Sequence, residues 1–292
     1  LRRRGIASGV ELPGMTRASA SGRHRGVAVT RRWGMVIDLD RCTGCQACTI
    51  ACRTENNVPF CGDKNASKGR GIFWNKVIAI REHPHRPPEG LEETKPAEEQ
   101  SAGNHSRPHM RFLPLPCMHC DNSPCTMLCP VRATFRGAEG IVMQVPSRCI
   151  GCRLCQAGCP YSRRYFNWQE PAYTGDLKQG LNPDVSLRTL GVIEKCTFCV
   201  HRLQKAREQA RAENRDIRED EYIPACVEAC AAKARTFGDL NNREHAVYKL
   251  SHSSRAFQLL PELGTSPKVF YLKEGGWQVD EPEQHAVGRP NV

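Results

Sequence analysis

The sequence predicts an α+β fold in which two similar modules carry long loop insertions and a C-terminal extension. Sixteen of the 17 cysteines fall into four groups of four, which indicates an internal repeat. Segments of alternating apolar and polar residues precede two of these groups and predict short strands. A polar insertion within the fourth group has the composition of a helix.

The four cysteine groups share one spacing. Groups one and three, CTGCQACTIAC and CIGCRLCQAGC, separate successive cysteines by two, two and three residues. Group two widens the second gap to four residues, and group four widens the same gap to 26. Insertions at one fixed place of a repeated unit are typical of loops. The groups are Cys42, Cys45, Cys48 and Cys52; Cys117, Cys120, Cys125 and Cys129; Cys149, Cys152, Cys155 and Cys159; and Cys196, Cys199, Cys226 and Cys230, with Cys61 left over as a bystander thiol.

Local patterns predict the elements around these groups. MVIDLD at 35–40 and IVMQVP at 141–146 alternate with period two, so each is expected to be a strand that leads into a cysteine loop. Residues 200–213 are rich in Ala, Arg, Glu and Gln and predict a helix, and residues 243–260 are a second, weaker helix candidate. Residues 81–109, rich in Pro, Glu and His, predict a long exposed loop.

The tight cysteine spacing points to iron–sulfur chemistry. A C-x2-C-x2-C loop brings three thiolates around one cluster, and in two-cluster ferredoxins the following cysteine serves the neighbouring cluster. Four such groups make two pairs of clusters, and four ligands for each cluster account for all sixteen cysteines. The sequence therefore predicts two bacterial-ferredoxin-like modules that together carry four 4Fe-4S clusters.

Two other uses of clustered cysteines are zinc binding and disulfide formation. Four-cysteine zinc sites combine two short knuckles with a longer spacer, a pattern that group four alone matches. Because the other three groups do not match it, a multi-zinc binding module is the less favoured alternative. Disulfides between cysteines two residues apart would be strained.

Charge and motifs exclude several function classes. The formal charge of +11 falls to about +3 once four clusters, each with a charge of about −2, are included. Most of the basic excess therefore balances the charge of the clusters, and no nucleic-acid binding is expected. No phosphate loop, nucleotide fingerprint or acid–base pair appears, so the chain is not expected to be an enzyme by itself. Arg41, Arg148, Arg153 and Lys195 lie next to cysteines and are candidates for tuning the cluster potentials.

The ends and the hydropathy of the chain lead to two further expectations. Residues 1–32 are a basic tail, and no apolar segment follows its arginines as an export signal requires. No apolar run approaches the roughly 20 residues that span a bilayer, so no membrane span is expected.

Five strings carry a family resemblance: MVIDLDRCTGCQACTIAC, PCMHCDNSPCTMLCP, RCIGCRLCQAGCPY, EKCTFCVHR, and CVEAC followed by FGDLN. Together they resemble the iron–sulfur beta subunits of complex iron–sulfur molybdoenzymes, over about residues 33–275. The likeness extends to the subunits that pair with NrfD-type membrane proteins, as in polysulfide reductase, the menaquinone-reducing Qrc complex and alternative complex III.

This resemblance implies an electron-transfer subunit of a quinone-linked respiratory complex. Its implied partners are a molybdopterin-type or multihaem redox subunit and an NrfD-type quinone-binding membrane subunit. The implied location is peripheral on the bacterial inner membrane, with the periplasmic face favoured over the cytoplasmic one. The alternative function is that of a free soluble polyferredoxin that shuttles electrons between enzymes.

The resemblance also implies how the cysteines pair, because in that family the first motif combines with the fourth and the second with the third. Set one is Cys42, Cys45, Cys48 and Cys230; set two is Cys52, Cys196, Cys199 and Cys226; set three is Cys117, Cys120, Cys125 and Cys159; set four is Cys129, Cys149, Cys152 and Cys155. Some relatives lack one ligand and carry a 3Fe-4S cluster, but all sixteen cysteines are present here, so none is indicated.

The residues after each group are consistent with this pairing. Pro130 and Pro160 follow the last cysteines of groups two and three, whereas Arg53 and Ala231 occupy that place in groups one and four.

The expected domains are the tail, module one (33–80 plus 190–240, groups one and four), module two (110–170, groups two and three) and a C-terminal docking extension (241–292).

Overall fold

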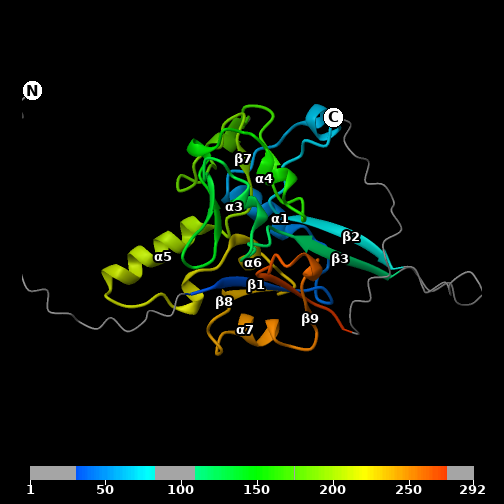
Figure 1. The fold of residues 1–292 in the computed structure, drawn as a ribbon, viewed down its shortest axis with the longest axis vertical. Coiled ribbons are helices and arrows are strands. Elements are labelled where there is room, and N and C mark those ends of the chain that lie inside the picture. The colour runs from blue at the N-terminus through cyan, green and yellow to red at the C-terminus, as the bar shows by residue number, and fades with distance from the viewer. Residues whose placement is uncertain (1–30, 83–108, 174, 275–292) are drawn as a thin grey trace, which may run out of the picture.

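A four-stranded sheet runs across the lower half of the molecule in Figure 1. The computed structural model describes residues 31–82, 109–173 and 175–274. The central strand β1 (Trp33–Asp38) pairs antiparallel with β8 (Arg235–Asp239) and parallel with β10 (Val269–Leu272). The edge strand β9 (Ala256–Phe257) pairs antiparallel with β10, so the order is β8-β1-β10-β9.

Successive side chains of β1 enter two different cores, because strand side chains alternate between faces. Met35 and Ile37 belong to the main core, which also contains buried cysteines of the groups. Val36 packs on the other face against Val247, a buried residue of α7 (Ala246–Ser251). The predicted strand at 35–40 is confirmed, two residues earlier than expected.

Three two-stranded antiparallel ribbons complete the strands. They are β2 (Lys76–Glu82) with β3 (His109–Leu115), β4 (Thr134–Arg136) with β5 (Val142–Gln144), and β6 (Tyr165–Phe166) with β7 (Ile193–Glu194). The strand expected at 141–146 is confirmed as β5, which ends early because Pro146 begins the 3-10 turn η1 (Pro146–Arg148). The long loop predicted at 81–109 has its first and last residues in β2 and β3, and its remainder lies outside the described residues.

One short helix recurs in every cysteine group. The helices are α1 (Ala47–Glu55), α3 (Pro124–Met127), α4 (Leu154–Ala157) and α6 (Ala225–Glu228). Each carries the third cysteine of its group: Cys48, Cys125, Cys155 and Cys226 respectively. The remaining short elements are α2 (Asp63–Ala66), η2 (Gly175–Lys178), η3 (Glu219–Glu221) and η4 (Pro261–Leu263).

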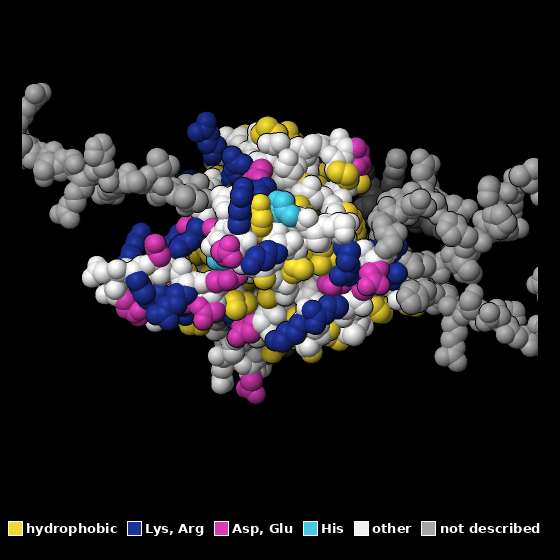
Figure 2. Space-filling view, turned by 90° about the horizontal axis from the view of Figure 1, so that it is seen from below, with side chains coloured by type: hydrophobic (Ala, Val, Ile, Leu, Met, Phe, Trp, Pro, Cys, Tyr) yellow, Lys and Arg dark blue, Asp and Glu magenta, His cyan; other side chains and the backbone are white. Residues whose placement is uncertain are grey.

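The helix predicted at 200–213 is confirmed as α5 (Val200–Ala212), which projects from the body in Figure 1. Its buried residues His201, Leu203, Ala206 and Ala210 recur at helical spacing, so one stripe packs inward. At the edge of this stripe the partly buried Arg207 forms an ion pair with Glu139, at 2.7 Å. Figure 2 shows basic and acidic side chains mixed over the face seen from below, instead of a single-sign surface. Within the described residues, no helix has the length and apolar character needed to cross a bilayer.

The helix predicted at 243–260 is wrong beyond α7. Residues 256–257 extend as β9, because their backbone pairs with β10, and Leu260 adopts a left-handed conformation with φ 50°. Tertiary strand pairing overrides a weak helical propensity here. In its described part, the segment predicted as a docking extension supplies α7, β9 and β10 to module one, and docking itself stays a prediction.

Residues 265–268 connect the four-stranded sheet to the loop of group two. The Lys268 amide donates to the Met118 carbonyl oxygen at 2.9 Å, and the Lys268 carbonyl accepts from the Met35 amide at 2.9 Å. The Lys268 side chain is fully buried, and its Nζ lies 2.7 Å from Oδ1 of Asp121, directly after Cys120. The segment after η4 therefore joins the four-stranded sheet to the group-two loop through backbone hydrogen bonds and an ion pair.

Candidate metal centres

A left-handed residue precedes the second cysteine of every group. These residues are Gly44 (φ 70°), His119 (φ 45°), Gly151 (φ 69°) and Phe198 (φ 54°). A left-handed residue within such a turn makes successive backbone N–H groups converge, which forms a concavity for an anionic group. The same backbone geometry therefore recurs in all four groups, although glycine fills the position in only two of them.

Gly151 illustrates why the position is demanding. A Cβ added there would lie 2.2 Å from the carbonyl oxygen of Gly191, whereas a Cβ at Gly62, with φ 70°, meets nothing within 4 Å. We expect Gly62→Ala to cost the backbone strain alone, about 1–2 kcal/mol. Gly151→Ala is expected to cost more and to lower the iron bound per chain, because the group-three loop must move away from residue 191. Thermal unfolding and iron analysis of both variants check this, and equal stability and iron content in the two would contradict it.

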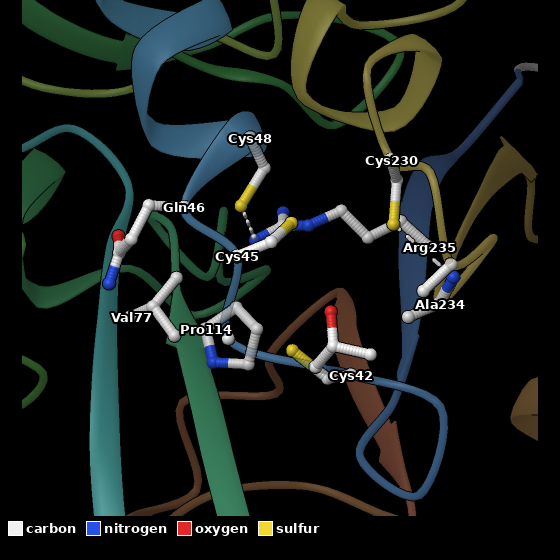
Figure 3. A pocket seen from close by; sticks show the side chains of 12 residues that line it. Cys42, Cys45, Gln46, Cys48, Val77, Pro114, Cys230, Ala234 and Arg235 are labelled. Carbon is white, nitrogen blue, oxygen red and sulfur yellow. Dashed lines mark hydrogen bonds between the residues drawn. The ribbon is translucent and has the colours of Figure 1, made fainter.

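Set one lines a small cavity (Figure 3). Cys42, Cys45 and Cys48 enter it from the group-one loop and α1, and Cys230 enters from the end of group four. Burial raises the pKa of Cys42, and the nearby thiols of Cys48 and Cys230 act in the same direction. Four converging thiols fit a metal cluster, because its cationic core stabilises them as thiolates.

Set two lies deeper in module one. Burial raises the pKa of Cys52, and the neighbouring Cys196, Cys199 and Cys226 add to the effect. These residues come from α1, from the loop before α5 and from α6. The structure thus brings the last cysteine of group one among three cysteines of group four.

An ion-pair network ties these three helices together. Glu55, at the end of α1, receives hydrogen bonds from Arg202 of α5, whose Nη1 also donates to Glu228 of α6 at 2.6 Å. The hydrogen bond from Arg202, together with His201, outweighs burial and lowers the pKa of Glu55 to about 2. This carboxylate therefore stays ionised at neutral pH and holds the helices that carry set two.

Sets three and four occupy module two. Burial raises the pKa of Cys120 to about 12, with contributions from Cys117, Cys125 and Cys159. Burial also raises the pKa of Cys155, where Cys125 and Cys149 are the neighbouring thiols. Cys129 follows α3 and the exposed Cys152 precedes α4, and these two helices pack together.

Two aromatic rings meet where set two adjoins set three. His119 lies between Cys117 and Cys120, Phe198 lies between Cys196 and Cys199, and the rings stack with centroids 3.7 Å apart. Burial, followed by the charges of Lys195 and Lys268, holds the pKa of His119 well below its usual value, so the ring is neutral. Its Nδ1 accepts a hydrogen bond from the Val142 amide at 3.1 Å.

The candidate tuning residues divide into exposed and buried ones. Arg41, Arg148 and Arg153 are exposed, and Arg153 stacks over Trp168 at 5.0 Å. Lys195 is buried, but its Nζ donates to backbone carbonyls, including that of Cys196 at 2.5 Å, and not to a thiol.

Two buried arginines that the sequence analysis missed do contact thiols. Arg235 Nη2 lies 3.5 Å from Cys48 Sγ, and Arg164 Nη2 lies 3.0 Å from Cys125 Sγ. Each arginine stands five residues after the last cysteine of its group, so aligning groups three and four with each other would have found both.

Comparisons with known proteins agree with this geometry. A 4Fe-4S dicluster domain matches residues 108–174, and a 4Fe-4S binding domain matches residues 33–54. The cysteine motifs therefore bind 4Fe-4S clusters, which defines the class of protein. Both matches also disfavour the multi-zinc alternative.

Full-length relatives place the protein more narrowly. It is 45% identical over 250 residues to the iron–sulfur cluster-binding subunit of menaquinone reductase from Nitratidesulfovibrio vulgaris, covering 84% of this chain and 90% of the relative. It is 39% identical to the iron–sulfur subunit of a putative dimethyl sulfoxide reductase of Halobacterium salinarum, covering 82% and 78%. It is 31% identical to a polysulfide reductase chain of Wolinella succinogenes, covering 85% and 98%. The protein belongs to the family of electron-transfer iron–sulfur subunits of quinone-linked respiratory oxidoreductase complexes.

Proposed function

We propose that the chain carries four 4Fe-4S clusters, one on each of the four cysteine sets. The observation that carries this proposal is the cavity in which Cys230 joins Cys42, Cys45 and Cys48, because these residues come from the first and last groups. The electrostatic neighbours of Cys52 and Cys120 support sets two and three in the same way. Each bound cluster supplies a one-electron carrier.

The contacts between sets support one linear order. Arg235 lies between sets one and two, the His119–Phe198 stack lies between sets two and three, and Arg164 lies between sets three and four. The exposed Cys45 and Cys152 belong to sets one and four, at the two ends of this order. Electrons enter at one end and leave at the other.

The partners are proposed from the relatives. Named relatives include a menaquinone reductase subunit and a polysulfide reductase chain. We assign the protein to a complex with a molybdopterin-type or multihaem redox subunit and an NrfD-type quinone-binding membrane subunit, on the periplasmic face of the inner membrane. Exposed apolar side chains on the packed helices α3 and α4 and in the loop before α4, namely Met127, Leu154 and Ile150, favour docking over free diffusion as a polyferredoxin.

Isolation of the protein from native membranes in mild detergent, under anaerobic conditions, tests the proposal. We expect co-elution with a larger redox subunit and a membrane subunit, and about 16 iron and 16 sulfide per chain once this subunit has been separated from them. Zinc in place of iron, or an iron-free chain, would refute the cluster assignment. Recovery at full yield as a monomer without detergent would instead support the free shuttle.

A further inference from the structure

Two buried arginines occupy the same place in two repeats. Arg164 follows Cys159 by five residues, and Arg235 follows Cys230 by five. The local backbone is also equivalent: the Arg163 amide donates to Cys159 Sγ at 3.4 Å, and the Ala234 amide donates to Cys230 Sγ at 3.3 Å. One structural device therefore occurs once in each module.

Arg235 lies between the two cysteine sets of module one. Its Nη2 is 3.5 Å from Cys48 Sγ of set one, and its Nη1 is 3.7 Å from Cys226 Sγ of set two. Asn75 Oδ1 accepts from the same Nη2 at 2.8 Å and fixes the plane of the guanidinium. Figure 3 shows this guanidinium reaching into the set-one cavity beside Cys48.

Arg164 has the same relation to module two. Its Nη2 donates to Cys125 Sγ of set three at 3.0 Å, while its Nη1 contacts Thr134 and Gln144, each at 3.0 Å. Cys125 packs in one buried cluster with Cys155 of set four, so the guanidinium that contacts Cys125 lies at the junction of the two sets.

Neither charge has a carboxylate partner among the ion pairs of the described residues. Arg164 is 3% exposed and Arg235 is 5% exposed, and a buried cation without a counter-charge is strongly unfavourable. The cysteine sulfurs that these arginines contact, once ionised as cluster ligands, therefore supply the counter-charge.

We propose that Arg235 and Arg164 are shared internal cations, each of which raises the reduction potentials of both clusters in its own module. The inference rests on the ligand sets proposed above. Reduction adds one negative charge to a cluster, and a fixed positive charge in a low-dielectric interior stabilises that charge. Because each arginine acts on both sets of one module, it also offsets the repulsion between the two reduced clusters.

Anaerobic redox titration followed by electron paramagnetic resonance tests the proposal in the complete protein. In Arg235→Gln, two of the four one-electron steps should become at least tenfold less favourable, a fall of about 59 mV in each midpoint potential. In Arg164→Gln, the other two steps should move by a similar amount. Arg→Lys at either site keeps the positive charge. Its midpoint potentials should therefore fall by no more than half as much as those of the Gln variant.

Each variant is the control for the other, and iron and sulfide counts separate the two proposals. A parent chain with fewer than four clusters refutes the ligand sets. Fully loaded Gln variants whose four steps stay in place, or move together in both variants, refute the role of the arginines. If a Gln variant does not bind its clusters, the Lys variant at the same site decides. Normal cluster content with near-parental potentials supports the role of the positive charge. Loss of iron, or the full tenfold shift, overturns that role.

Discussion

Replacing Cys52 or Cys226 by alanine is expected to remove the same cluster, although the two residues lie in the first and fourth groups. Either change should lower bound iron by about a quarter, because each cluster needs four thiolate ligands. The double variant should lose no more iron than either single one, since both residues belong to set two. A double variant of Cys52 and Cys155, which belong to different sets, should lose about half.

Iron and sulfide analysis of anaerobically purified chains measures these differences. Cys61→Ala is the matched control, because Cys61 lies outside the four sets and should leave iron unchanged. Iron losses that add up for Cys52 and Cys226 would show that the two residues hold separate clusters and that the first and fourth groups do not cross.

Asp121→Ala is expected to cause the largest loss of stability, about 3–5 kcal/mol, because it leaves the Lys268 ammonium buried without a carboxylate. Lys268 is fully buried, and burial already lowers its pKa, an effect that Asp121 opposes. Asp121 also accepts a hydrogen bond from Arg32 Nε at 2.8 Å. Since this site joins the group-two loop to the residue before β10, its loss should loosen the contact between the modules.

Anaerobic thermal unfolding measures this effect, and a fall of roughly 10 °C in Tm is expected for a chain of this size. The double variant Asp121→Ala with Lys268→Met should recover much of the loss, because no buried charge then remains. A double variant as unstable as Asp121→Ala would show that the ammonium is not the cause.

Most of the candidate site could be predicted because its information is local. Cys42, Cys45 and Cys48 lie within seven residues of one another, and their spacing is enough to indicate an iron–sulfur protein. The arginines could not be found from cysteine neighbours, because Arg235 reaches Cys48 across 187 residues of sequence. Lys195, the buried candidate next to a cysteine, instead points at backbone oxygens.

The fold shows the same division between local and distant information. The strand β1 and the helix α5 follow from periodicity and composition, and both were predicted. The segment at 256–272 was not, because β9 and β10 are defined by pairing with each other and with β1, more than 200 residues earlier. The terminal segment completes a sheet that the beginning of the chain starts.

This closure through β10 has a consequence for biosynthesis. Chains emerge from the ribosome in order, and units that are complete in sequence fold first. Residues 117–159 contain every cysteine of sets three and four, so on the proposed ligand sets this segment can bind iron before the rest of the chain is made. On the same proposal, sets one and two are complete only when Cys230 and Cys226 have been translated, and the sheet beside them is complete only with the strand at 269–272.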